Sequence, residues 1–230
     1  MRAEKLLDAQ QKAEHLFAVA QDRGYIASGQ MEKDLNTKMY DLAHELYGIR
    51  KYWHKRIVRS GANTLLPYRE NPPNLPITPD DILFFDFGPV FEDWEADVGR
   101  TYVLGDDAAK HKLSTDIVAG WHEGKAYFRD HPNITGSELY AFSSAMARRY
   151  GWEYGGPHCG HLIGNFPHEQ IQGEEVENYI HPDNHQRMAD PDRHGAFRHW
   201  IYEIHFVDQA RQIGGFFEQL LTVDLHEGGR

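Results

Sequence analysis

Acidic residues interrupt four apolar stretches of this 230-residue chain. The stretch Ile82-Leu83-Phe84-Phe85-Asp86-Phe87-Gly88 is one example. The four acids are Asp86, Asp97, Glu203 and Glu218. A carboxylate in a buried strand costs free energy unless it is paired or bound to a metal. One such acid fits a structural salt bridge, but the only basic residues near these runs are Arg100 and Arg211. We therefore expect the four acids to converge on one site.

A histidine in a glycine-flanked stretch completes the candidate donor set. Residues 160–169 read GH-x-IG-x-x-x-HE and include His161 and His168, seven positions apart. Glycine permits close backbone approach, and neutral imidazole is the commonest transition-metal ligand. Four converging carboxylates would repel one another, whereas two divalent cations would neutralise them. The set favours Mn, Co, Fe or Zn, and paired ions of this kind activate water and polarise a carbonyl.

The elements that must position these residues are helices and strands in a doubled order. Apolar periodicity predicts helices over 3–23, after a Ser28 cap, over about 107–129 and after the Thr135-Gly136-Ser137-Glu138 capping box. Strand character marks the stretches 52–59, 82–88, 94–104, 200–207 and 215–223. The order of paired helices followed by acid-bearing strands occurs twice, without a fixed-period repeat.

Composition excludes several function classes. The net charge of −11 argues against nucleic acid or an anionic membrane as the main partner. The lone Cys159 excludes a disulfide framework within the chain. The N-terminus is too polar for a signal peptide, and no apolar run approaches a membrane span. We expect a soluble, cytoplasmic protein, in which the polar segment 170–198, with His181, His185 and His194, is a solvated loop.

The ordered motifs resemble a known metallopeptidase superfamily. They are the DFG of Asp86, Asp97 eleven residues later, Gly99-Arg100-Thr101, the stretch containing His161, Glu203 in a strand, and Glu218 before Gln219-Leu220-Leu221-Thr222-Val223. This pattern is similar to that of methionine aminopeptidase, aminopeptidase P, prolidase and creatinase. The resemblance covers roughly residues 55–224.

The resemblance implies an α+β pita-bread fold with two pseudo-symmetric halves, a curved, mainly antiparallel sheet and outer helices. Because the chain is short, we expect a single catalytic domain over 1–230 without the separate N-terminal domain of the aminopeptidase P or creatinase type. Asp86 would bind one metal ion and His161 the other, while Asp97 and Glu218 bridge both. Glu203 would ligate the second ion and assist as general base, and His168 would hydrogen-bond the scissile carbonyl or the tetrahedral intermediate.

Two departures from the family pattern bear on the substrate contacts. Many relatives have a histidine near the place where Tyr68 stands, so the Tyr68 hydroxyl is predicted to contact substrate instead. After Glu203, where proline is usual, the chain has Ile204 and then His205. Side chains two apart on a strand share a face. His205 is therefore either a substrate-pocket residue or a partner that orients a carboxylate.

These residues predict a dinuclear metal-dependent hydrolase that cleaves an amide C–N bond of a peptide or peptide-like molecule, as an aminopeptidase or Xaa-Pro peptidase. One alternative is a creatinase-like hydrolase of a non-peptide C–N bond. Another is an inactive member that binds a ligand or partner. The expected partners are a peptide or small-molecule substrate and, as in many relatives, a second copy in a homodimer.

Overall fold

A seven-stranded antiparallel sheet forms the centre of the molecule in the computed structural model, which describes residues 2–166, 175–192 and 195–222. The strands lie in the order β1-β2-β5-β9-β8-β6, and β7 pairs with β8. Their bounds are β1 Ile57–Ser60, β2 Asp81–Phe87, β5 Val98–Leu104, β6 Glu153–Tyr154, β7 Leu162–Ile163, β8 His199–Asp208 and β9 Ile213–Leu220. A separate pair joins β3 Val90–Phe91 to β4 Trp94–Glu95.

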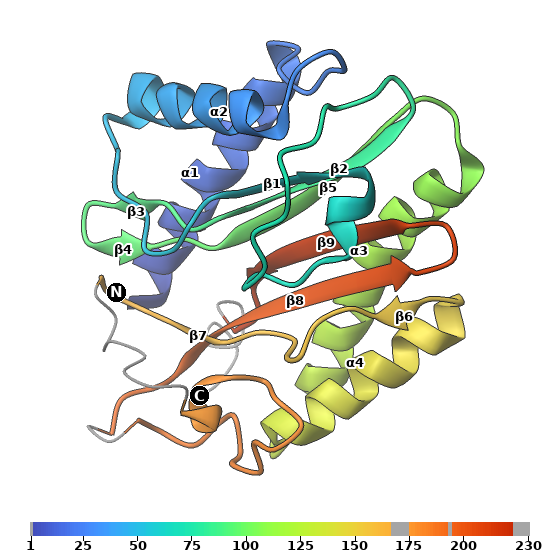
Figure 1. The fold of residues 1–230 in the computed structure, drawn as a ribbon. Helices are drawn as coiled ribbons and strands as arrows, with labels where there is room; N and C mark the ends of the chain where they lie inside the picture. Colours follow the sequence, from blue (N-terminus) through green and yellow to red (C-terminus); the bar gives the residue numbers. More distant parts are fainter. Residues whose placement is uncertain (1, 167–174, 193–194, 223–230) are drawn as a thin grey trace.

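Two pairs of helices cover the sheet, one pair for each half (Figure 1). Their bounds are α1 Arg2–Asp22, α2 Glu32–Tyr47, α3 Ala108–Asp130 and α4 Gly136–Tyr150. Leu16, Phe17 and Met39 from the first pair pack with Phe85 and Phe87 of β2 in one buried cluster. A second cluster unites α3 and α4 with β8 and β9. Two short 3-10 helices, η1 Gly61–Leu65 and η2 Val176–Asn178, lie in the connections.

Alternation along β8 separates the packing face from the site face. Trp200, Tyr202, Ile204 and Phe206 belong to the cluster with α3 and α4, which confirms the prediction that these four residues lie beneath the outer helices. The indole of Trp121 donates to the Tyr202 carbonyl and ties α3 to the strand. Glu203 and His205 therefore point to the opposite face of the sheet.

The predicted helices are confirmed with small shifts of their ends. Asp107 caps α3 through the amides of Ala109 and Lys110, and the Thr135–Glu138 capping box opens α4. Ser28 does not cap α2. That helix begins after Met31, whose amide donates to the Asp34 side chain.

Two predicted strands are shorter than expected. The stretch 52–59 is a strand only from Ile57, because the chain before it makes a single bridge between Tyr52 and Pro89. The stretch 94–104 breaks at residues 96–97, where the chain passes from the β3–β4 pair into β5. At this break the Ala96 amide donates to the Pro89 carbonyl, and Asp97 follows it into the site.

Candidate active site

Asp97 lies at the centre of the candidate site, in the break between β4 and β5. Its side chain is 3% exposed, and both of its oxygens face imidazoles. Oδ2 lies 3.0 Å from Nε2 of His161. Oδ1 lies 3.1 Å from Nε2 of His54, which is also 3.6 Å from Oδ1 of Asp86. One carboxylate therefore has two ligand clusters, one beside each oxygen.

His161 is held beside β8 by backbone contacts. Its carbonyl accepts from the Ile201 amide at 2.8 Å. The preceding Gly160 has φ of +141°, and a Cβ there would lie 2.1 Å from the Ile201 carbonyl oxygen. Nδ1 of His161 donates to the Leu162 carbonyl at 2.8 Å. Nε2 is therefore the nitrogen that faces the acids, and it lies 3.7 Å from Oε1 of Glu218 on its second side.

The two glutamates occupy opposed positions on neighbouring strands. Glu203 of β8 pairs directly with Glu218 of β9, and both are buried. Glu218 is also the register partner of Gly99, two residues after Asp97. Oε1 of Glu203 lies 3.1 Å from Nδ1 of His158. The sheet register thus brings Glu203 of β8 and Glu218 of β9 beside Gly99 of β5, two residues after Asp97.

Burial and like charge shift the pKa values of the acids apart. Burial, reinforced by Asp97 and Glu203, raises the pKa of Asp86 to about 7. Burial and then Asp97 raise the pKa of Glu218 well above its ordinary value. Burial also acts to raise the pKa of Asp97, but His54 and His161 outweigh burial and lower that pKa to about 2. This pattern shows how strongly the cluster resists carrying all of its negative charge at once.

The neighbouring acids raise the pKa values of the two histidines beside Asp97. Burial disfavours the charged form of His54, but Asp97 and Asp86 outweigh it and raise its pKa to about 9. Likewise, Asp97 and Glu218 overcome burial and raise the pKa of His161 well above 6.5. Protonated imidazoles thus offset part of the negative charge of the acids, as a bound cation would.

The arrangement fits divalent metal ions by its donor set and its spacing. Two groups of oxygen and nitrogen atoms lie close enough to surround an ion: His54 with Asp86 and Asp97, and Asp97 with His161 and Glu218. Oε2 of Glu218 is buried without a hydrogen-bond partner among the described residues. Carboxylate and imidazole donors suit Mn, Co, Fe or Zn. An acceptor left unpaired in such a cluster is what a missing cation would satisfy.

All five predicted metal ligands lie in or beside this cluster. Asp86, Asp97, His161 and Glu218 supply the grouped atoms, and Glu203 stands directly across the strand pair from Glu218. His168, the predicted substrate-contact residue, lies outside the described residues.

The remaining two predicted residues flank the cluster. The Tyr68 hydroxyl accepts from the Lys55 amide at 3.3 Å, and its ring centroid is 5.6 Å from that of His54. The His205 ring is buried on the same strand face as Glu203, and its Nε2 donates to the Thr64 carbonyl at 2.8 Å. Neither group belongs to the two sets of grouped ligand atoms.

Three aromatic residues beside the cluster were missed in the sequence. His54 stands 32 residues before Asp86, a spacing that belongs to no motif, so contact alone reveals it. The Trp53 ring lies against both His54 and His161, with centroids 4.4 and 5.2 Å away. Tyr179, from the segment expected to be a solvated loop, contacts the rings of His158 and His161. That segment also buries Ile180, Asn184 and Met188, so its described part is packed rather than solvated.

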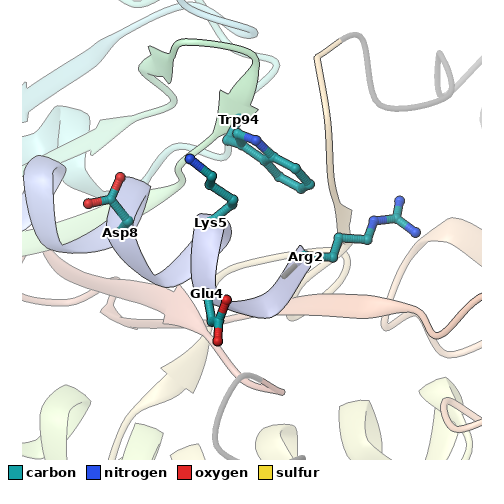
Figure 2. A pocket seen from close by; sticks show the side chains of 5 residues that line it. All are labelled: Arg2, Glu4, Lys5, Asp8 and Trp94. Atoms are coloured by element: carbon teal, nitrogen blue, oxygen red, sulfur yellow. The ribbon is translucent and has the colours of Figure 1, made fainter.

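A hollow elsewhere on the surface lacks this chemistry. It lies at the start of α1 and is lined by Arg2, Glu4, Lys5, Asp8 and Trp94 (Figure 2). Its side chains are of mixed charge, and the described residues that line it include no histidine. Donor atoms that could hold a metal ion are instead grouped in the acid–imidazole cluster.

The sequence matches the model of metallopeptidase family M24 over residues 4–196, and the chain belongs to this family. Among curated proteins it is similar to an Xaa-Pro dipeptidase of Pyrococcus horikoshii, with 28% identity over 145 residues, 63% of this chain and 40% of that protein. The family resemblance stated from the motifs is confirmed.

Solved structures share the fold at low sequence identity. An X-Pro aminopeptidase from Thermotoga maritima has a TM-score of 0.72 at 18% identity, over 95% of this chain and 60% of that one. A dipeptidase from Pyrococcus horikoshii has a TM-score of 0.72 at 21% identity, over 94% of this chain and 55% of that one. A methionine aminopeptidase from Rickettsia prowazekii has a TM-score of 0.67 at 14% identity, over 94% of this chain and 90% of that one. The predicted pita-bread fold is confirmed, while the chain spans about half the length of most relatives it matches.

Each helix in the described part of the chain is too short or too polar to cross a membrane.

Proposed function

We propose that the chain is a metal-dependent peptidase that hydrolyses the amide bond of Xaa-Pro dipeptides or related short peptides. The observation that carries this proposal is the convergence of Asp86, Asp97, His161 and Glu218, whose ligand atoms form two groups sharing Asp97. The Xaa-Pro dipeptidase and X-Pro aminopeptidase among its relatives support the substrate class.

Two divalent ions are proposed for the two groups of ligand atoms. Asp97 would bridge them, because one of its oxygens faces Asp86 and His54 and the other faces His161. Glu218 would be the second bridging residue. Its Oε1 is 3.7 Å from His161, and its Oε2 has no hydrogen-bond partner in the described part of the chain. When bound, such ions supply an activated water and polarise the scissile carbonyl.

Glu203 is proposed as the fifth ligand and general base. Burial raises the pKa of Glu203, but His158 beside it outweighs burial and lowers that pKa, so the carboxylate is ionised. An ionised carboxylate at the edge of the cluster can take a proton from the attacking water and pass it to the leaving amine. Tyr154 donates to the Glu203 carbonyl at 2.8 Å and helps to hold this part of β8 in place.

The substrate contacts are proposed for Tyr68, His168 and His205. Tyr68 lies over His54 at the margin of the cluster. His205 is held by the Thr64 carbonyl on the face that carries Glu203. His168 keeps the proposed role of hydrogen-bond donor to the carbonyl.

A substrate panel combined with one charge-removing variant tests this proposal. The full chain supplied with Mn²⁺ or Co²⁺ is expected to hydrolyse Xaa-Pro dipeptides, and Asp97→Asn is expected to reduce both turnover and retained metal to background. Asp41→Asn on the exposed side of α2 is the matched control and should change neither. Peptides with N-terminal Met, together with creatine, complete the panel. Hydrolysis of creatine alone would favour a creatinase-like activity, and undiminished metal and turnover in Asp97→Asn would refute the proposal.

A further inference from the structure

We propose that His54 is a direct ligand of the ion held by Asp86 and Asp97, in addition to the five ligands assigned above. This inference rests on the proposed function, since it requires a metal ion at that position. It assigns a sixth protein ligand to the site and gives each ion an imidazole of its own.

The spacing of the atoms around His54 fits one common ion. Nε2 of His54 lies 3.1 Å from Oδ1 of Asp97 and 3.6 Å from Oδ1 of Asp86. Ligand atoms at about 2.1 Å from an ion lie about 3.0 Å apart at octahedral angles and about 3.4 Å apart at tetrahedral angles. The side chains of His54, Asp86 and Asp97 are 7%, 11% and 3% exposed. Three donor atoms at these separations, on side chains almost closed to solvent, fit the coordination of one metal ion.

The second nitrogen of His54 holds the ring in the tautomer that a ligand requires. Nδ1 donates to the Lys55 carbonyl at 2.7 Å, so Nε2 is the nitrogen that faces the acids and could give its lone pair to an ion. A metal-bound histidine usually has this partner for its other nitrogen.

His161 repeats the same arrangement on the other side of Asp97. Its Nδ1 donates to the Leu162 carbonyl at 2.8 Å, which is again the carbonyl of the next residue. The Nε2 atoms of the two rings face the two different oxygens of Asp97, at 3.1 and 3.0 Å. His54 and His161 are thus equivalent partners of one bridging carboxylate, and a metal-binding role for one applies to the other.

The loop that carries His54 is built to keep the ring in this place. The Trp53 amide donates to the Gly88 carbonyl, and its indole donates to the Ala96 carbonyl at 2.9 Å. A Cβ at Gly88 would lie 2.2 Å from Cδ2 of His54, so the glycine after Asp86-Phe87 makes room for the imidazole. The two anchoring carbonyls belong to Gly88, two residues after Asp86, and to Ala96, directly before Asp97.

A competing role for His54 is that of a hydrogen-bond donor to substrate, which would leave metal binding unchanged. The geometry favours the ligand role because both acids that Nε2 approaches are themselves metal ligands by this assignment. Metal affinity separates the two roles without any measurement of turnover.

The first experiment measures cobalt binding to the intact chain. Metal-free protein is titrated with Co²⁺ against a competing chelator, and bound metal is counted after gel filtration. Wild type is expected to retain two ions per chain, whereas His54→Ala and His54→Gln should bind one of them at least about 10-fold more weakly. His44→Ala, an exposed histidine on α2, is the matched control and should bind like wild type.

The second experiment needs no substitution at the site. In proton NMR spectra of the cobalt-loaded wild type, imidazole N–H protons of ligating histidines are shifted far outside the ordinary range and exchange with D₂O. Two such resonances are expected, from Nδ1–H of His54 and of His161, and His54→Gln should lose one. A single shifted N–H in wild type, or unchanged affinity for two ions in both variants, would overturn the inference. If wild type binds no cobalt, the proposed function is refuted, and the ligand role of His54 is refuted with it.

Discussion

Glu203 and Glu218 face each other directly across the β8–β9 pair, and both carboxylates are buried. Like charges at directly opposed strand positions destabilise a sheet. Burial and the nearby Asp97 already raise the pKa of Glu218 well above its ordinary value. The metal-free protein therefore contains a repulsion that a divalent cation would remove.

The first prediction follows from that repulsion. At a free Mn²⁺ concentration of 100 times its Kd, binding stabilises the folded state by about 2.7 kcal/mol, so Tm should rise by roughly 5–10 °C. Metal-free Glu218→Gln should be at least as stable as metal-free wild type and gain much less from Mn²⁺. Thermal unfolding with and without the ion measures both effects. Glu45→Gln on the exposed surface should follow wild type; an equal Mn²⁺ shift in Glu218→Gln would contradict the assignment.

A second prediction concerns the close approach of Gly160 to β8. Alanine at this position would combine φ of +141° with a Cβ 2.1 Å from the Ile201 carbonyl oxygen. Strained backbone of this kind costs about 1–3 kcal/mol before the clash is counted. Gly160→Ala should lose more than about 2 kcal/mol in urea unfolding and bind metal more weakly, because His161 shifts. Gly151→Ala, with φ of +87° and open space, should lose only about 1 kcal/mol. Equal losses in the two variants would refute the close-contact argument.

The buried Glu32 carboxylate leads to a third prediction. Its oxygens accept from the Ser60 amide at 2.7 Å, from Asn63 Nδ2 at 3.0 Å and from the Leu75 amide at 3.1 Å. Glu32→Gln presents an NH₂ group to these donors, so it should cost about 2–3 kcal/mol. Chemical denaturation measures the loss. Glu45→Gln again provides a surface comparison, and Glu32→Gln should retain metal. A loss below that of the surface variant would mean that the network stabilises little.

The fourth prediction is the pH dependence of stability at His205. Burial lowers the pKa of this histidine below 6.5, and the bond to the Thr64 carbonyl only partly offsets burial. Since the unfolded chain binds the proton more tightly, the stabilising contribution is complete above 6.5 and is lost as pH falls through the lowered pKa. The advantage of metal-free wild type over metal-free His205→Gln in the free energy of unfolding should therefore shrink on acidification. Urea unfolding of both proteins between about pH 5 and pH 8 measures this difference, and a difference that does not change with pH would contradict the prediction.

The sequence predicted the acids that the structure brings together because their constraint is local. An acid inside an apolar strand such as that of Asp86 is unusual by itself, and the alternation of β8 places Glu203 and His205 on one face. His54 could not be found in this way. Its position depends on Trp53 bonding to Gly88 and Ala96, contacts that no periodicity encodes. For the same reason, the stretch before Ile57 was predicted as strand although its chain turns to carry His54 inward.

The break at residues 96–97 shows a second limit of local reasoning. The stretch from Trp94 to Leu104 has continuous strand character, but the structure divides it between two sheets. The division brings both oxygens of Asp97 into the cluster. The strand prediction is thus wrong at Asp97, where the irregular backbone turns the carboxylate toward the cluster.

The junction between the two half-cores runs through the proposed ligands. Asp86 and Asp97 come from the half covered by α1 and α2, whereas His161, Glu203 and Glu218 come from the half covered by α3 and α4. Across β5 and β9 the halves meet in register at Gly99 and Glu218. Each proposed ion would therefore act as a cross-link between the halves, like a disulfide between two modules. Withdrawing the metal should then speed amide hydrogen exchange first in β5 and β9, before either half-core opens.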